Sequence, residues 1–248
     1  MTLDYLSIIS NETSRIVNAF ERDRQAAVPW SDRWTVATVA RHVAATHHVV
    51  AEIVEGRPVA DFGLLVSSKR RRKTPPSLSD GSAPALLRCS SNCRVFPSAM
   101  SVGRGSRPGA MSAGGLAAWR SRPFVHRTDT DAAQAKELSV SPDVAADGID
   151  EFLDVFVAAS RAAHDAPIGP TMRFECSDRN ERWWLDLSEQ GKRIVSREPR
   201  DASVRIRGTA EQLLLIVWGR VPASLPAGVK VSGDVATLDR WAEFVPPM

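Results

Sequence analysis

Cysteine is scarce in this sequence, and that scarcity excludes one class of small extracellular protein. The 248 residues include three cysteines, Cys89, Cys93 and Cys176. Three cysteines do not make the disulfide framework of a small secreted domain. The Cys89-x-x-x-Cys93 pair lacks a second pair, so we do not predict a metal or redox site there. We expect reduced thiols and a cytoplasmic location.

Long apolar runs are also missing. No stretch approaches the roughly 20 apolar residues of a membrane-spanning helix, so we expect no membrane contact. The first residues, Met1-Thr-Leu-Asp-Tyr5, have no basic stretch followed by an apolar one. We therefore do not expect a secretory signal.

Acidic residues are almost absent between Leu64 and Arg122, where eleven basic residues accompany one acid, Asp80. This segment carries a net charge of +10. Since the whole chain carries +3, the rest of the chain carries −7. An acidic remainder argues against nucleic-acid binding by the folded parts. The run Lys69–Lys73 leaves a nucleic-acid contact open, although a solvated basic run is the simpler interpretation.

The N-terminal region has the apolar spacing of two helices. Residues 3–24 predict one helix, and residues 35–55 predict a second that ends at Gly56. The turn between them contains Pro29, which disfavours a continuing helix. Two amphipathic helices joined by a short turn indicate the start of an up-down bundle.

The last third of the chain predicts a small α+β domain. A helix is expected over 142–163, followed by strands near 172–177, 183–188, 193–197, 202–207 and 229–231. A strongly apolar helix over 210–218 should begin at the N-cap Thr209 and stop at Gly219. Asp234 should cap a final helix that runs through Phe244.

Three parts of the sequence resemble a known family, the mycothiol-dependent maleylpyruvate isomerases, which are DinB-like four-helix bundles with a family C-terminal domain. They are Trp34–His42, Phe124–Asp129, and Val204–Pro222 followed by Gly233–Arg240. The resemblance covers about residues 3–60 and 123–245 and stops between them. It implies an α+β protein with domains at 1–62 (first part of the bundle), 63–122 (basic segment), 123–140 (remnant of the bundle) and 141–248 (α+β domain).

The resemblance also implies a divalent metal, zinc, in the bundle core. Its ligands would be a histidine on the second helix and a glutamate and a histidine four residues apart on a later helix, a spacing that places both on one helical face. His42 and His126 match the two histidines. Arg122 stands where the glutamate is expected, and a guanidinium repels a cation.

Simpler interpretations compete with these roles. By helical geometry His47 lies at the centre of the apolar stripe and His42 on its flank, so His47 should be a packed core histidine. His48 and His164 should be surface residues, and Asp129 and Asp131 should lie on a solvated helix face. Trp183, Trp184 and Trp218 should be core. The resemblance assigns Arg220 to a substrate carboxylate, but it could equally complement the end of its helix.

The segment 63–122 does not fit the family pattern, and we hypothesise that it is translated out of the ancestral reading frame. It has no sustained period, it is rich in Arg, Ser, Pro and Gly, and the resemblance resumes just after it. A genuine basic, disordered insertion is the competing interpretation.

Taken with the resemblance, the sequence predicts a metal- and mycothiol-dependent enzyme that isomerises a small unsaturated carboxylate. The metal would favour the thiolate, which would add to a cis double bond. The partners would be a small thiol and a small carboxylate or electrophile. A mycothiol S-transferase on the same scaffold, or a binding or regulatory protein without catalysis, remain alternatives.

Overall fold

The computed structural model describes residues 3–54, 122–157, 169–189, 194–220 and 226–244. The chain divides into two compact units, Met1–Leu138 and Ser139–Met248. Most of the basic segment, including Lys69–Lys73, Cys89 and Cys93, lies outside the described residues, as does His164. No helix in the described part combines the length and the apolar character of a membrane span.

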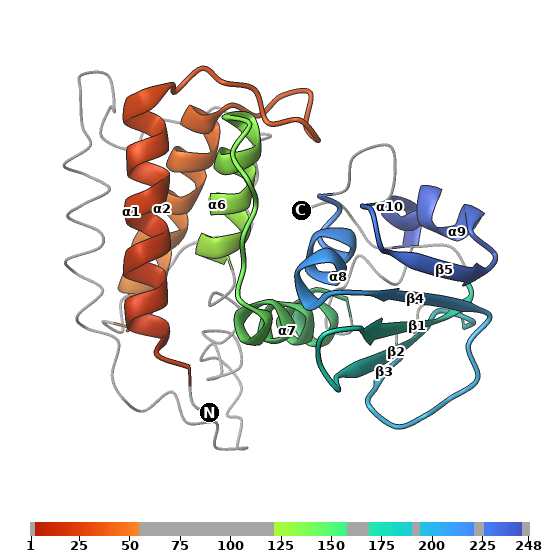
Figure 1. Ribbon diagram of the computed structural model, residues 1–248. Helices are drawn as coiled ribbons and strands as arrows, with labels where there is room; N and C mark the ends of the chain where they lie inside the picture. Colours follow the sequence, from red (N-terminus) through yellow and green to blue (C-terminus); the bar gives the residue numbers. More distant parts are fainter. Residues whose placement is uncertain (1–2, 55–121, 158–168, 190–193, 221–225, 245–248) are drawn as a thin grey trace. The chain divides into compact units, whose positions relative to one another are not determined.

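Unit 1 contains three described helices that pack on one another, α1 (Tyr5–Arg22), α2 (Val36–Val54) and α6 (Arg122–Ala133) (Figure 1). The two N-terminal helices were predicted within two residues at each end. Asp4 caps α1 by accepting a hydrogen bond from the Ser7 backbone N–H at 3.2 Å. A DinB-like four-helix bundle stays a prediction, because the remaining part of unit 1 is not described.

The core of unit 1 follows from the apolar faces of its helices. Buried residues of α1, the following turn and α2 form one cluster: Ile16, Val17, Val28, Val39, Ala40 and Val43. Trp30 and Trp34 pack against this cluster from the connection between the helices. Trp34 also places its ring beside His42.

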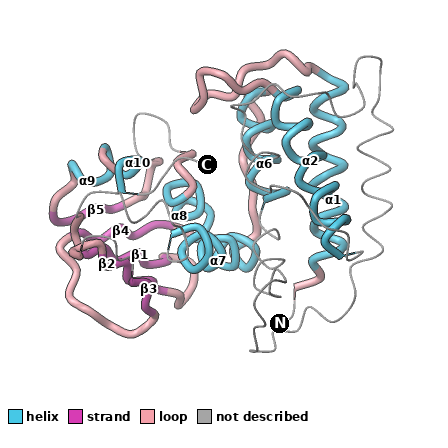
Figure 2. Tube along the Cα trace, turned by 180° about the vertical axis from the view of Figure 1, so that it is seen from behind, coloured by secondary structure: helices cyan, strands magenta, loops and turns pink. Residues whose placement is uncertain are grey.

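Unit 2 is mixed helix and sheet, which confirms the predicted α+β class. Its five strands are β1 (Thr171–Cys176), β2 (Arg182–Asp186), β3 (Ile194–Ser196), β4 (Val204–Gly208) and β5 (Lys230–Gly233). Their order is β3-β2-β1-β4-β5, with β1 and β4 parallel and the other neighbours antiparallel (Figure 2).

Helices cover one face of this sheet. α7 (Pro142–Glu151) continues into a π-helical turn, η2 (Phe152–Val157), and Asp150 of α7 accepts a hydrogen bond from Trp183 Nε1 at 2.7 Å. Trp218, just after α8 (Ala210–Val217), donates to the Gly148 carbonyl at 3.2 Å. Trp183 and Trp218 are core residues, as predicted. Trp184 is buried too, as predicted, although it lies on the opposite face of the sheet.

The helix termini of unit 2 confirm one predicted cap and correct another. Thr209 and Gln212 form a reciprocal capping box at the start of α8, and Gly219 adopts φ +68° at its end. The single final helix was wrong. Asp234 does accept from the Ala236 N–H at 3.2 Å, but the segment forms two short helices, α9 (Ala236–Asp239) and α10 (Trp241–Phe244).

Candidate functional site

His42 and His126 lie ring to ring in unit 1. Their ring centroids are 4.8 Å apart at an interplanar angle of 71°. Trp34 contacts both rings, with centroid distances of 5.2 Å to His42 and 5.6 Å to His126. His42 is half-buried on α2, and His126 is 4% exposed on α6. The fold therefore brings together the two predicted site histidines beside an aromatic wall.

Arg122 belongs to the same cluster. It lies one helical turn before His126 on α6, and its Nη1 is 3.4 Å from His42 Nε2. Arg122 is 9% exposed, so its guanidinium is held within the protein. Position 122 thus faces His42, as the spacing predicted, but it presents a cation there.

Asp129 orients His126. His126 Nδ1 donates to Asp129 Oδ2 at 2.8 Å, and Trp30 Nε1 donates to Asp129 Oδ1 at 2.7 Å. The prediction of a solvated helix face was wrong for this residue, because Asp129 is 1% exposed. A carboxylate on one ring nitrogen fixes the tautomer and the ring orientation, as it does for many catalytic and metal-bound histidines.

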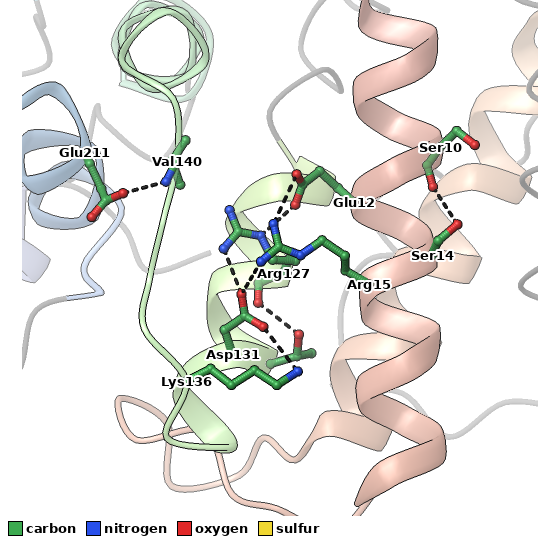
Figure 3. A network of polar contacts seen from close by, with 10 residues as sticks. Ser10, Glu12, Ser14, Arg15, Arg127, Asp131, Lys136, Val140 and Glu211 are labelled. Carbon is green, nitrogen blue, oxygen red and sulfur yellow. Dashed lines mark hydrogen bonds and ion pairs between the residues drawn. The ribbon is translucent and has the colours of Figure 1, made fainter.

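Asp131 is also buried, and the prediction fails for it too, but its role is different. It accepts from Arg127 Nη1 at 2.8 Å and from Arg15 Nη2 at 3.3 Å (Figure 3). Arg127 Nε also donates to Glu12 Oε2 at 2.6 Å. This network joins α6 to α1. We assign it a structural role.

His47 is a packed core histidine, as predicted. It is 9% exposed, and neither ring nitrogen has a hydrogen-bond partner in the part of the chain that the structure describes. Its pKa is lowered from 6.5 to about 4, first by burial and then by the nearby His126. His47 is therefore neutral at physiological pH. His48, by contrast, is exposed, as predicted.

A divalent metal does not fit the described residues. Among them no group of three or more His, Cys, Asp or Glu side chains could hold an ion. Arg122 Nη1 lies 3.4 Å from His42 Nε2, one of the two ring nitrogens through which His42 could bind a metal. Two imidazoles facing a guanidinium are a poor donor set for a cation and a better one for a carboxylate or thiolate.

Arg220 lies in unit 2, just beyond α8. Its Nη1 donates to the Trp218 carbonyl at 2.6 Å, and its guanidinium carbon lies 5.8 Å from the centroid of the Trp218 ring. An arginine that bonds a terminal carbonyl complements the end of its helix. The structure thus favours the simpler of the two predicted roles, and the substrate role stays a prediction.

Sequence reasoning missed Trp30, Trp34 and Asp129 as parts of the site. The spacing of Asp129 three residues after His126 was a usable signal, since residues three apart share a helical face. The two tryptophans gave no such signal, because they precede α2, and their contacts with His126 and Asp129 depend on the packing of the α2 region on α6.

Comparison with known proteins adds one finding. Residues 143–240 match the family model described as the MDMPI C-terminal domain. The match lies within unit 2, so this unit is similar to that family domain. Comparison with curated proteins gave no match.

Proposed function

We propose that this protein is a mycothiol-dependent enzyme of the maleylpyruvate isomerase type that acts on a small unsaturated organic acid. The family match over 143–240 supports the general class. One observation supports a location for the site. The ring centroids of His42 and His126 are 4.8 Å apart, and the Trp34 ring lies next to them.

The proposed reaction conserves its atoms. A thiolate adds to one carbon of a conjugated cis double bond. A carbon–sulfur bond forms, the former double bond becomes a single bond, and its electron pair moves onto the conjugated carbonyl as an enolate. Rotation about that bond and cleavage of the carbon–sulfur bond return the thiolate and release the trans isomer. A mycothiol S-transferase would share the first step and keep the carbon–sulfur bond.

The residues of this chain have separate proposed roles. The Arg122 guanidinium favours a nearby thiolate over a thiol, and it pairs with a substrate carboxylate. Asp129 holds His126 in one orientation towards the cluster. Arg220 would orient a carboxylate only by leaving the Trp218 carbonyl that it now binds.

Zinc is the part of the family expectation that fits this chain least, because Arg122 occupies the place of a ligand. We assign no step to a metal. In a site with an intact ligand set, the metal would supply the stabilisation of the thiolate. Here the Arg122 cation is the described group that can supply part of it.

A non-catalytic protein that binds a small carboxylate is the second candidate. The observation that favours it is again Arg122, a buried guanidinium that suits an anion and stands where the resemblance implies a metal ligand. The two candidates share the same residues and differ in whether bonds change.

The test is an isomerisation assay on the full chain. Purified protein is mixed with mycothiol and maleylpyruvate, and formation of the trans isomer is followed by ultraviolet absorbance. We expect mycothiol-dependent turnover that falls by about tenfold or more in His42→Ala and Arg122→Gln, but not in the exposed-site control His48→Ala. Saturable binding of the acid without turnover would select the second candidate. Neither turnover nor binding would reject both.

A further inference from the structure

The face of the unit 2 sheet opposite to its helices is rich in arginine. In β4, Arg205 and Arg207 are exposed and alternate with buried Val204 and Ile206. The strand register adds residues from β1, β2 and β5 to the same side. We call this set the basic face: Arg173, Glu175, Arg182, Arg205, Arg207 and Lys230. The net charge on this side of the strands is +3, because the five cations outnumber the two acids, Glu175 and Asp186.

Like charges sit opposite each other on the basic face. Arg173 is the register partner of Arg205 across β1 and β4, and Arg207 is the register partner of Lys230 across β4 and β5. Like charges directly opposite each other destabilise a sheet. The fold does not need them, since the core lies on the other face. A sequence that breaks a local rule at exposed positions points to a functional constraint.

Glu175 shows how a carboxylate is held on this face. It forms an ion pair with Arg173, and its Oε1 lies 3.5 Å from Arg207 Nε and 3.9 Å from Arg182 Nη2. One carboxylate is therefore shared by three guanidiniums. Arg205 and Lys230 make no ion pair with any described residue. Two cations of the basic face, Arg205 and Lys230, are therefore available to a ligand, and Glu175 shows that the arginines of this face pair with carboxylates.

Single-stranded nucleic acid suits the basic face less well than an acidic polypeptide. Single strands bind by stacking bases on exposed aromatic rings. The aromatic residue on this side of β2, Trp184, is 5% exposed and lies 5.4 Å from the Arg173 guanidinium carbon. A base could not stack on a ring that is already covered.

We propose that the basic face docks an acidic segment of a partner polypeptide, whose carboxylates pair with Arg205, Arg207 and Lys230. Binding would relieve the repulsion between the opposed cations. The proposal is independent of the site in unit 1, because each of its residues belongs to unit 2.

The test uses the full chain, a synthetic peptide of alternating Glu and Ser residues, and carbodiimide coupling. This reagent joins carboxyl groups to lysine amines that they contact, and mass spectrometry locates each joined lysine. Lys230 reports on the basic face separately from Lys69 and Lys73 of the basic segment. We expect coupling at Lys230 that falls at least fivefold in the Arg205→Gln/Arg207→Gln variant. The control, Arg24→Gln/Arg33→Gln, removes two exposed cations from unit 1 and should leave coupling unchanged.

Thermal unfolding of the same variants gives a second readout. Without peptide, Arg205→Gln should unfold at the same temperature as the wild type or higher, because a repulsive pair is lost. Coupling at Lys69 or Lys73 without coupling at Lys230 would overturn the proposal. So would equal losses in both double variants, or tighter, Arg205-dependent binding of a duplex DNA than of the peptide.

Discussion

Nη1 of Arg122 lies 3.4 Å from Nε2 of His42, at the helical position where the family resemblance implies a glutamate ligand. A carboxylate at the same helical position would face the same nitrogen with the opposite charge. The resemblance therefore implies an anionic ligand at a position where this chain presents a cation.

Arg122→Glu should create a metal site. Replacing the cation by a carboxylate supplies a third ligand beside His42 and His126, so we expect zinc affinity to rise by on the order of tenfold or more. Zinc content by elemental analysis and affinity by chelator competition measure the change. His42→Ala in the same background should abolish the gain, and an unchanged affinity in Arg122→Glu would contradict the ligand geometry.

Asp129→Asn should lower both stability and site order. The carboxylate accepts from Trp30 and His126, and losing charged hydrogen bonds inside the protein costs about 2–4 kcal/mol in unfolding free energy. Denaturant unfolding measures this cost. Asp32→Asn, at an exposed position, is the matched control and should change stability by less than about 0.5 kcal/mol.

Arg127→Met should be strongly destabilising. Arg127 is 1% exposed and bonds both Glu12 and Asp131, so its loss leaves the buried Asp131 with weaker compensation. Breaking a buried pair from one side costs about 3–5 kcal/mol in unfolding free energy. Arg240→Met, which breaks an exposed pair with Glu243, should cost less than about 1 kcal/mol. Similar losses of unfolding free energy in the two variants would show that burial does not set the contribution of these ion pairs to stability.

His47 predicts a pH dependence of stability. Its pKa is lowered from 6.5 in the unfolded chain to about 4 in the folded protein, so the unfolded state binds the proton first as pH falls. Stability is fully present above pH 6.5 and is lost towards pH 4, by about 3 kcal/mol. In wild-type protein the unfolding free energy should therefore fall between pH 6.5 and pH 4, and in His47→Leu this pH dependence should be lost. The control is the exposed neighbour: His48→Leu should keep the pH dependence.

Gly233→Ala should destabilise unit 2 more than Gly228→Ala. Both glycines have positive φ, +92° and +91°, so both substitutions incur about 1–2 kcal/mol of backbone strain. At Gly233 an added Cβ would also lie 1.9 Å from the Ser203 carbonyl oxygen, whereas at Gly228 the nearest atom would be 3.9 Å away. Thermal unfolding measures the difference. Equal midpoint temperatures for the two variants would show that β4 and β5 can move apart at Gly233 without loss of stability.

Local patterns predicted most of the elements because local physics sets them. The apolar period located α1 and α2, and the Thr209 cap and Gly219 stop located α8. The final helix was misjudged because Arg240 ends α9, a break that the apolar pattern does not record. The burial of Asp129 and Asp131 was misjudged because their partners, Trp30 and Arg15, come from distant parts of the chain.

The sequence by itself determined which chemistry is present: two histidines, an arginine in place of a carboxylate, and an α+β domain with its caps. Only the tertiary structure decided which of these groups meet. The packing of α2 on α6 put Arg122 against His42 and buried Asp129 beside His126. The pairing of β1, β4 and β5 likewise aligned like charges that are far apart in the chain. Helical and strand periods depend on neighbours in sequence, whereas such contacts depend on packing between elements, which a single sequence does not display.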